Sequence, residues 1–136
     1  KGDFEASVRL HSVPDTHEWA KAGIMLRTLE NDAAPNVTVL GTNKYGLVFQ
    51  ERQAVGEATA QPKRISWTNG EPVYIKLIRA GNNVTGAMSY DGKFWTTVYT
   101  TYIDLPESVF IGPAVTSHAG GSTGKAVFSE WKLELY

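Results

Sequence analysis

Six polar side chains stand beside apolar residues in segments that alternate with a period of two. They are Glu5, Arg27, Gln50, Arg52, Tyr74 and Lys76. Successive side chains of a strand point to opposite faces, so these six emerge together if their neighbours fill a core. An arginine fork can donate two hydrogen bonds to adjacent hydroxyls or to a carboxylate, while glutamate and glutamine accept from hydroxyls. Tyrosine adds an apolar plate with a polar tip. We therefore predict one shared polar face that suits a sugar.

A plainer interpretation of the same residues stays open. Glu5, Arg27 and Arg52 could pair across neighbouring strands as surface ion pairs, each worth about 0–1 kcal/mol. Such pairs would make the face a solvated surface without a ligand.

The pattern of acidic residues gives little support for catalysis. Glycoside hydrolysis needs two carboxylates at a defined separation. The nearest acidic pairs, Glu30 with Asp32 and Asp104 with Glu107, fall in predicted loops. The sequence also has no Gly-x-Ser-x-Gly elbow, phosphate-binding loop or dinucleotide fingerprint. We therefore predict that the chain is not an enzyme.

We expect no cofactor. The chain has no cysteine, which excludes thiolate chemistry, and its three histidines lack the spacing of zinc ligands. Asp3, Asp32 and Asp104 are candidate ligands for a structural calcium ion, although no segment has the spacing of a calcium loop.

The length and net charge of the chain limit the classes of protein to which it can belong. The 136 residues suffice for a single domain over 1–136, and 13 basic against 14 acidic residues leave a net charge of −1. This balance argues against a nucleic-acid partner. No apolar run reaches the roughly 18 residues of a membrane span, so no membrane partner is expected. Because the chain opens at Lys1 without Met, we expect a module cut from a larger secreted protein.

Short segments rich in Val, Ile, Thr and Tyr predict about ten strands. Residues 4–10 and 73–78 alternate between apolar and polar, which is typical of half-buried strands. Residues 109–115 are apolar on both faces and predict a central strand. Glu51 falls on the core side of its segment, which predicts that the strand either frays or bulges there. The fold class is therefore all-β.

Turn signals separate these segments. Ala80 to Asn83 and Asn69 to Pro72 predict reversals of the chain, as does the stretch 119–122. The pair Asp91-Gly92 has the residue types of a type I′ hairpin turn.

The stretch from Thr16 to Leu29 fits two structures. An amphipathic helix could begin at Thr16, at a cost of about 1 kcal/mol for Gly23 in its interior. Alternatively a loop leads into a strand, with Ile24 and Leu26 facing inward and their neighbours outward. The local pattern leaves both open.

Six blocks in a fixed order carry a resemblance to a known superfamily. They are Gly2-Asp3-Phe4-Glu5, Lys21 to Arg27, Val48 to Arg52, Ile75 to Arg79, Ser89 to Trp95 and Ile111 to His118. This series resembles the concanavalin A-like lectin/glucanase domains and the related family 66 carbohydrate-binding modules. The resemblance implies a jelly-roll β-sandwich of two antiparallel sheets with a strand over Lys21 to Thr28. It also implies Glu5, Arg27, Gln50 and Arg52 as counterparts of the ligand-binding residues.

The tryptophans divide between structure and binding. Residues 89–95 are similar to an Asp-box turn, in which Asp91 accepts backbone N–H bonds and Trp95 packs beneath. Trp19 and Trp67 fall in or beside predicted loops, where each is a candidate plate for stacking a sugar.

Together these observations predict a non-catalytic carbohydrate-binding module, located outside a bacterial cell or on its surface. Two arginines favour a fructan or an acidic or terminal sugar, because plain cellulose calls for a flat row of aromatic side chains. The expected partners are carbohydrate and other domains of the same parent chain. The alternative is a structural or protein-interaction domain attached to a glycoside hydrolase, which would expose an apolar patch.

Overall fold

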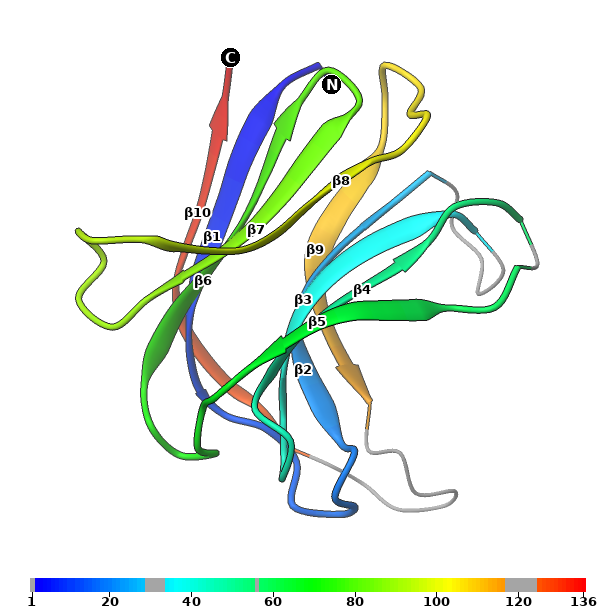
Figure 1. The fold of residues 1–136 in the computed structure, drawn as a ribbon. Helices are drawn as coiled ribbons and strands as arrows, with labels where there is room; N and C mark the ends of the chain where they lie inside the picture. The colour runs from blue at the N-terminus through cyan, green and yellow to red at the C-terminus, as the bar shows by residue number, and fades with distance from the viewer. Residues whose placement is uncertain (1, 29–33, 56, 117–124) are drawn as a thin grey trace.

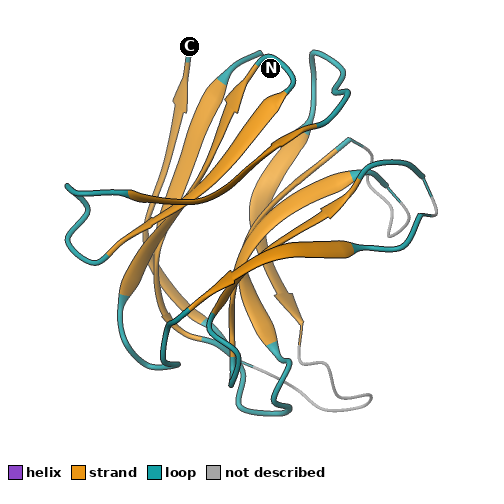
Figure 2. Ribbon diagram, in the orientation of Figure 1, coloured by secondary structure: helices purple, strands orange, loops and turns teal. Residues whose placement is uncertain are grey.

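The computed structural model describes residues 2–28, 34–55, 57–116 and 125–136, and its regular structure there is entirely β-strand (Figure 2). The strands are β1 (Phe4–Ser12), β2 (Lys21–Arg27), β3 (Asn36–Thr42), β4 (Leu47–Arg52), β5 (Ala60–Ile65), β6 (Val73–Ala80), β7 (Asn83–Ser89), β8 (Thr96–Tyr102), β9 (Phe110–Thr116) and β10 (Val127–Leu135). None of the described residues belongs to a helix that could cross a membrane.

The strands form two five-stranded antiparallel sheets that pack face to face (Figure 1). Sheet A has the order β10-β1-β6-β7-β8, and sheet B has the order β5-β4-β3-β2-β9. The prediction of an all-β jelly-roll sandwich is confirmed.

Alternation along the strands builds the core. In β1 the side chains of Phe4, Ala6, Val8 and Leu10 are buried, while those between them are half-buried. β6 repeats the pattern from Val73 onward. Each fully buried large apolar side chain contributes about 1.5–3 kcal/mol relative to exposure, so the alternation fixes which face of each strand turns inward.

The stretch around Gly23 forms a loop and then a strand, so the helical alternative is wrong. β2 runs from Lys21 to Arg27, with Ile24 and Leu26 fully buried and Met25 half-buried on the outer face. The strand is favoured over the helix because it buries the side chains of Ile24 and Leu26 between the two sheets.

The prediction of a central strand over 109–115 is also wrong, because β9 lies at the edge of sheet B. Its residues are half-buried or exposed, so the apolar run does not reflect cover on both faces. Pro113, which has no N–H to donate, fits an edge position. The predicted bulge near Glu51 is confirmed, since the pairing of β4 with β5 shifts between Phe49 and Glu51.

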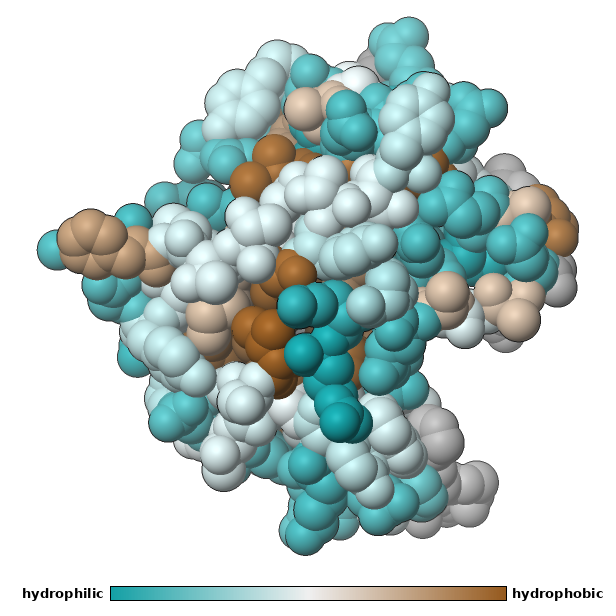
Figure 3. Space-filling view, in the orientation of Figure 1, coloured by the Kyte–Doolittle hydropathy of each residue, from teal (hydrophilic) through white to brown (hydrophobic). Residues whose placement is uncertain are grey.

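The sandwich is closed along one side and open along the other. On the closed side β8 contacts β4 and β5, and Figure 3 shows side chains filling the space between the sheets there. On the other side lie the edge strands β9 and β10. Leu133, Leu135 and Val115 follow the inward-facing positions of these strands, yet they are 42%, 63% and 51% exposed. An apolar surface therefore remains uncovered among the described residues.

The turn between β7 and β8 is built around Asp91. Its Oδ1 accepts hydrogen bonds from the backbone N–H groups of Lys93 and Phe94, at 2.8 and 2.9 Å, and from the Ser89 hydroxyl at 2.9 Å. The Asp-box prediction holds, but the type I′ turn is wrong. A type I′ turn needs positive φ at both central residues, and only Gly92 has it, at 76°.

The loop tryptophans differ from one another. Trp67 is buried in the core and donates its Nε1–H to the carbonyl of Glu71, so it is not available as a stacking plate. Trp19 is half-buried and stacks on Tyr45, with ring centroids 4.0 Å apart.

We expect Gly23→Ala to lower the free energy of unfolding by about 1–3 kcal/mol, measured by chemical denaturation. A Cβ there would collide with the carbonyl oxygen of Val39 and lie 2.8 Å from the Leu40 Cα, so the backbone of β3 has to move. Gly112→Ala in the adjacent β9 is the matched control, because a Cβ there meets nothing within 4 Å. Equal losses in the two variants would contradict the close approach of β2 and β3.

A second prediction concerns pH. The backbone N–H groups of Phe94 and Lys93, followed by the Ser89 hydroxyl, hold the pKa of Asp91 below its ordinary value of about 3.9. A lowered pKa gives stability that is present above about pH 4 and is lost as the pH falls through the folded-state value. We expect Asp91→Asn to remove this part of the pH dependence, seen by comparing both unfolding curves from pH 5 to pH 2. Parallel curves would show that the turn carboxylate contributes nothing.

Candidate functional site

The outer face of sheet B carries a row of three long polar side chains. Arg27 of β2 pairs with Asn36 of β3, and Asn36 pairs with Arg52 of β4. Residues directly opposite one another on neighbouring strands point to the same face, so the three side chains emerge side by side. The three residues lie at the ends of adjacent strands, so the Asn36 amide has one arginine on each side.

A second row lies one step along the same strands. Met25 pairs with Thr38, and Thr38 with Gln50. The two rows thus lie two residues apart on each strand. Here the middle strand contributes a hydroxyl between a thioether and an amide.

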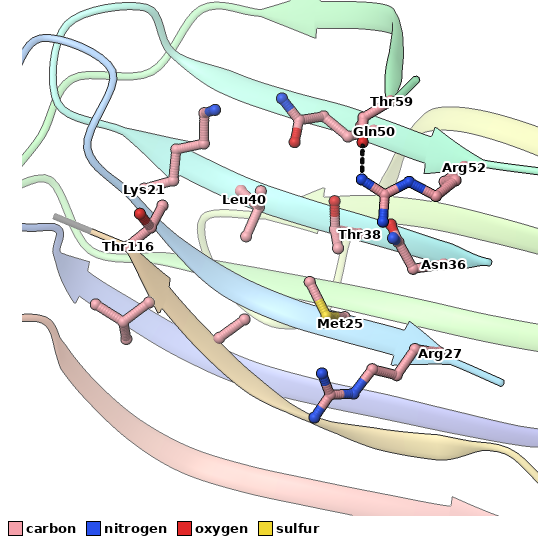
Figure 4. Close-up of a pocket in the computed structure, with 12 residues that line it drawn as sticks. Lys21, Met25, Arg27, Asn36, Thr38, Leu40, Gln50, Arg52, Thr59 and Thr116 are labelled. Atoms are coloured by element: carbon pink, nitrogen blue, oxygen red, sulfur yellow. Dashed lines mark hydrogen bonds between the residues drawn. The ribbon is translucent and has the colours of Figure 1, made fainter. Parts of the chain in front are cut away.

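These rows form the floor of a groove of about 240 Å³, which we call the sheet B groove (Figure 4). Its lining residues are Lys21, Met25, Arg27, Asn36, Thr38, Leu40, Gln50, Arg52, Thr59, Ala114, Val115 and Thr116. The edge strand β9 supplies one wall, and the segment leading into β5 supplies the opposite one.

Two lining side chains are held in place by that segment. Arg52 donates from Nε to the carbonyl of Glu57 at 2.8 Å and from Nη2 to the Thr59 hydroxyl at 3.1 Å. Gln50 donates from Nε2 to Oε1 of Gln61 at 2.9 Å. These bonds preorganise the Arg52 side of the groove and reduce the entropy lost on binding.

Two other polar groups of the groove lack a partner. The Thr38 hydroxyl is buried and has no hydrogen-bond partner within the part of the chain that the structure describes. A buried hydroxyl without a partner costs about 1–3 kcal/mol. Across the described residues Arg27 likewise has no hydrogen bond or ion pair, and Figure 4 shows its guanidinium on the β9 side. The groove therefore holds hydrogen-bonding capacity that the fold leaves unused.

The charged side chains that line the groove are all basic. Lys21, Arg27 and Arg52 are its charged residues, and no carboxylate belongs to the lining among the described residues. Lys21 lies at the opposite end from the two arginines, with Nζ 5.6 Å from the centroid of the Trp19 ring. Its partial burial lowers the pKa of the Lys21 ammonium.

The structure divides the six residues predicted to share a face. It brings Arg27, Gln50 and Arg52 together in the sheet B groove. Glu5, Tyr74 and Lys76 lie on the outer face of sheet A, on β1 and β6, so the prediction of one common face is wrong. Period two fixes which side chains point outward from a strand, but it does not say which sheet the strand joins. The outer faces of the two sheets point in opposite directions.

The charged side chains on the sheet A face pair with one another. The Lys76 ammonium lies 3.7 Å from the Glu5 carboxylate and 3.8 Å from the centroid of the Trp95 ring. Tyr74 donates its hydroxyl to the Glu130 carboxylate, 3.1 Å away, which also lies 3.7 Å from Arg9. Opposite charges thus pair on this face, as the interpretation of surface ion pairs expects for Glu5, although the buried Nε of Arg9 has no hydrogen-bond partner among the described residues.

Residues 36–38 show what the sequence prediction missed. Asn36-Val37-Thr38 reads as the start of a strand, and Val37 is fully buried. The same alternation that identified Arg27 therefore places Asn36 and Thr38 on the outer face. Alternation alone could thus have shown that Asn36 and Thr38 face outward. It could not place them in the groove, because that requires knowing that β3 lies between β2 and β4.

Other candidate chemistry is not assembled within the described residues. Asp104 and Glu107 are exposed in the loop between β8 and β9, whereas Glu30 and Asp32 lie outside the described residues. Asp3 accepts the N–H of Gly81 at 2.8 Å. No group of three or more His, Asp or Glu side chains that could hold a metal ion occurs in the described part of the chain.

Comparison with protein families finds no family model that matches, and comparison with curated proteins finds no matching relative. Solved structures do match. The GH43 protein BlXynB from Bacillus licheniformis superposes with a TM-score of 0.81 at 18% identity, over 100% of this chain and 28% of that one. A xylan β-1,4-xylosidase from Bacillus halodurans gives 0.73 at 14% identity, over 99% and 28%.

A smaller protein shows the same likeness over most of its length. The carbohydrate-binding module CBM66 from Bacillus subtilis superposes with a TM-score of 0.69 at 12% identity, over 99% of this chain and 76% of that one. Identities this low establish the fold alone. The resemblance found in the sequence is thus confirmed in architecture: the chain folds as a jelly-roll β-sandwich, like the carbohydrate-binding module from B. subtilis.

Proposed function

We propose that this chain is a non-catalytic carbohydrate-binding module that recognises a glycan through the sheet B groove. The observation that carries the proposal is the row of Arg27, Asn36 and Arg52 beside the unpartnered Thr38 hydroxyl. Donors arranged on adjacent rigid strands suit the closely spaced hydroxyls of a sugar ring. The likeness in fold to a carbohydrate-binding module, to part of a GH43 protein and to part of a xylosidase supports this choice.

The dimensions of the groove favour the end of a glycan. Its volume of about 240 Å³ lies below the roughly 300–1,000 Å³ of pockets that enclose a drug-sized ligand. The lining also contains no aromatic side chain among the described residues, so it lacks the stacking platform that a flat polysaccharide surface calls for. A fructan or an acidic or terminal sugar fits this groove better than plain cellulose.

The proposal that the module does not cleave its ligand rests on the same lining. Retaining and inverting glycosidases place two carboxylates about 5–10 Å apart across the scissile bond. The described lining offers cations, amides and hydroxyls for binding, and no acid–base pair. We propose that catalysis belongs to another domain of an extracellular or surface-attached bacterial parent chain, since this chain matches only 28% of the GH43 protein and 28% of the xylosidase to which it is similar.

We expect Arg27→Ala and Arg52→Ala each to weaken glycan binding by about 10- to 100-fold. A lost hydrogen bond to a charged group costs about 1.5–3 kcal/mol. The measurement is titration calorimetry with a ligand found by screening a glycan array. Lys132→Ala is the matched control, because it removes an exposed cation from β10 of sheet A. Unchanged affinity in both arginine variants, with folding verified by circular dichroism, would remove the sheet B groove as the site.

A second candidate function has its own supporting observation. The open side of the sandwich exposes inward-facing apolar residues of β9 and β10, including Trp131 at 43% and Leu135 at 63%. Exposed apolar surface of this kind marks interaction sites. The occupant we propose is a neighbouring domain of the same parent chain, so that the sandwich also serves as a structural support.

Amide hydrogen exchange tests this second function. We expect the amides of β9 and β10 to exchange more slowly in the parent chain than in residues 1–136 alone, because a docked domain would exclude water from the open side. The amides of β6 and β7, in the interior of sheet A, serve as the internal control. Identical rates for β9 and β10 in both chains would exclude a docked domain.

A further inference from the structure

We infer that the sheet B groove selects a sugar bearing a carboxylate, with Arg27 as the partner of that carboxylate. This inference rests on the proposed function and names the class of ligand. It is carried by the charge balance of the groove, by the unequal bonding of its two arginines and by the apolar surroundings of its unpartnered hydroxyl.

The charged groups of the sheet B groove favour an acidic ligand. The twelve lining residues include three cations and, among the described residues, no acid. On the outer face of sheet A, by contrast, Lys76 faces Glu5 and Arg9 faces Glu130. A carboxylate ligand brings the acidic group that the described lining lacks, whereas a neutral glycan does not. Complementary charge of this kind sets which ligand is accepted.

The two arginines differ in what they can offer a ligand. Arg52 already donates to Glu57 and Thr59, which fixes its position and uses part of its fork. Arg27 has no such bonds to any described residue, so its planar fork is open for the paired hydrogen bonds that a carboxylate accepts. We therefore assign the carboxylate to Arg27 and ring hydroxyls to Arg52.

The floor between the arginines strengthens both contacts. Thr38 adds a buried hydroxyl beneath this floor, and the hydroxyl has no hydrogen-bond partner among the described residues. Met25, Leu40 and Ala114 make the rest of the floor and wall apolar. Charge-assisted hydrogen bonds are stronger in such surroundings than in water, because the local dielectric constant is lower.

Lys21 extends the same preference to the far end of the groove. Its ammonium is partly buried beside Trp19, and burial lowers its pKa. An anion bound nearby favours the charged form of a lysine. A carboxylate ligand would therefore raise the pKa of Lys21, while a neutral sugar that merely buries it further would not.

The test compares ligands that differ only in charge. Trisaccharides of galacturonate, glucuronate and mannuronate are titrated at pH 7 in 0.15 M salt, each beside its carboxyl-reduced counterpart and beside a fructan trisaccharide. Short oligomers avoid the general attraction of a polyanion for a basic surface. We expect at least one uronate to bind about 10- to 100-fold more tightly than its reduced counterpart.

Arg27→Gln provides the second measurement, because glutamine keeps hydrogen-bonding capacity but removes the charge. We expect this variant to lose the preference for the uronate while it still binds the reduced sugar. Lys132→Gln, on the outer face of sheet A, is the matched control and should keep the preference.

The outcomes separate the two proposals. Equal binding of a uronate and its reduced form, tighter binding of the fructan, or a preference that survives Arg27→Gln would overturn the inference and leave the proposed function standing. Absence of binding to every charged and neutral sugar, both here and on the glycan array, would overturn the proposed function itself.

Discussion

The alignment of β2, β3 and β4 is the constraint on which the groove depends. Their large apolar side chains that face inward are all fully buried, and they are Ile24, Leu26, Val37, Val39, Leu47 and Phe49. If the pairing of a strand slipped by one residue, its buried side chains would face the solvent. Each of these side chains stabilises the fold by about 1.5–3 kcal/mol when it is buried. No contact on the outer face approaches this sum. The row of Arg27, Asn36 and Arg52 therefore owes its alignment to the core beneath it.

The limits of sequence prediction follow from the same constraint. Alternation was enough to predict that Arg27, Gln50 and Tyr74 point away from the core, because it depends on each strand alone. It could not separate Tyr74 from the two others, because the sheet to which a strand belongs depends on contacts between distant segments. β1 joins β6 across more than sixty residues of chain. For the same reason Asn36 and Thr38 were not predicted as site residues, although alternation places their side chains on the outer face.

The two outer faces show why exposed charge alone does not identify a site. Both carry several cations and polar groups. On sheet A, Lys76 and Arg9 have carboxylates 3.7 Å away, so these two cations are paired with acids. On sheet B the cations lie together without a described carboxylate in the lining, and Thr38 is buried without a partner. What distinguishes the groove is that its lining holds cations but no described acid, whereas the cations of sheet A have acids beside them.

The open side of the sandwich also bears on the groove, because β9 belongs to both. Ala114, Val115 and Thr116 all line the sheet B groove, and Val115, which follows the inward-facing positions, is 51% exposed. β9 is paired with β2 alone, so one ladder of hydrogen bonds holds this wall in place. A domain docked on the open side would pack behind β9 and restrict its movement. Packing at one face of this edge strand would then preorganise the binding surface on the other, linking the two functions through a single strand.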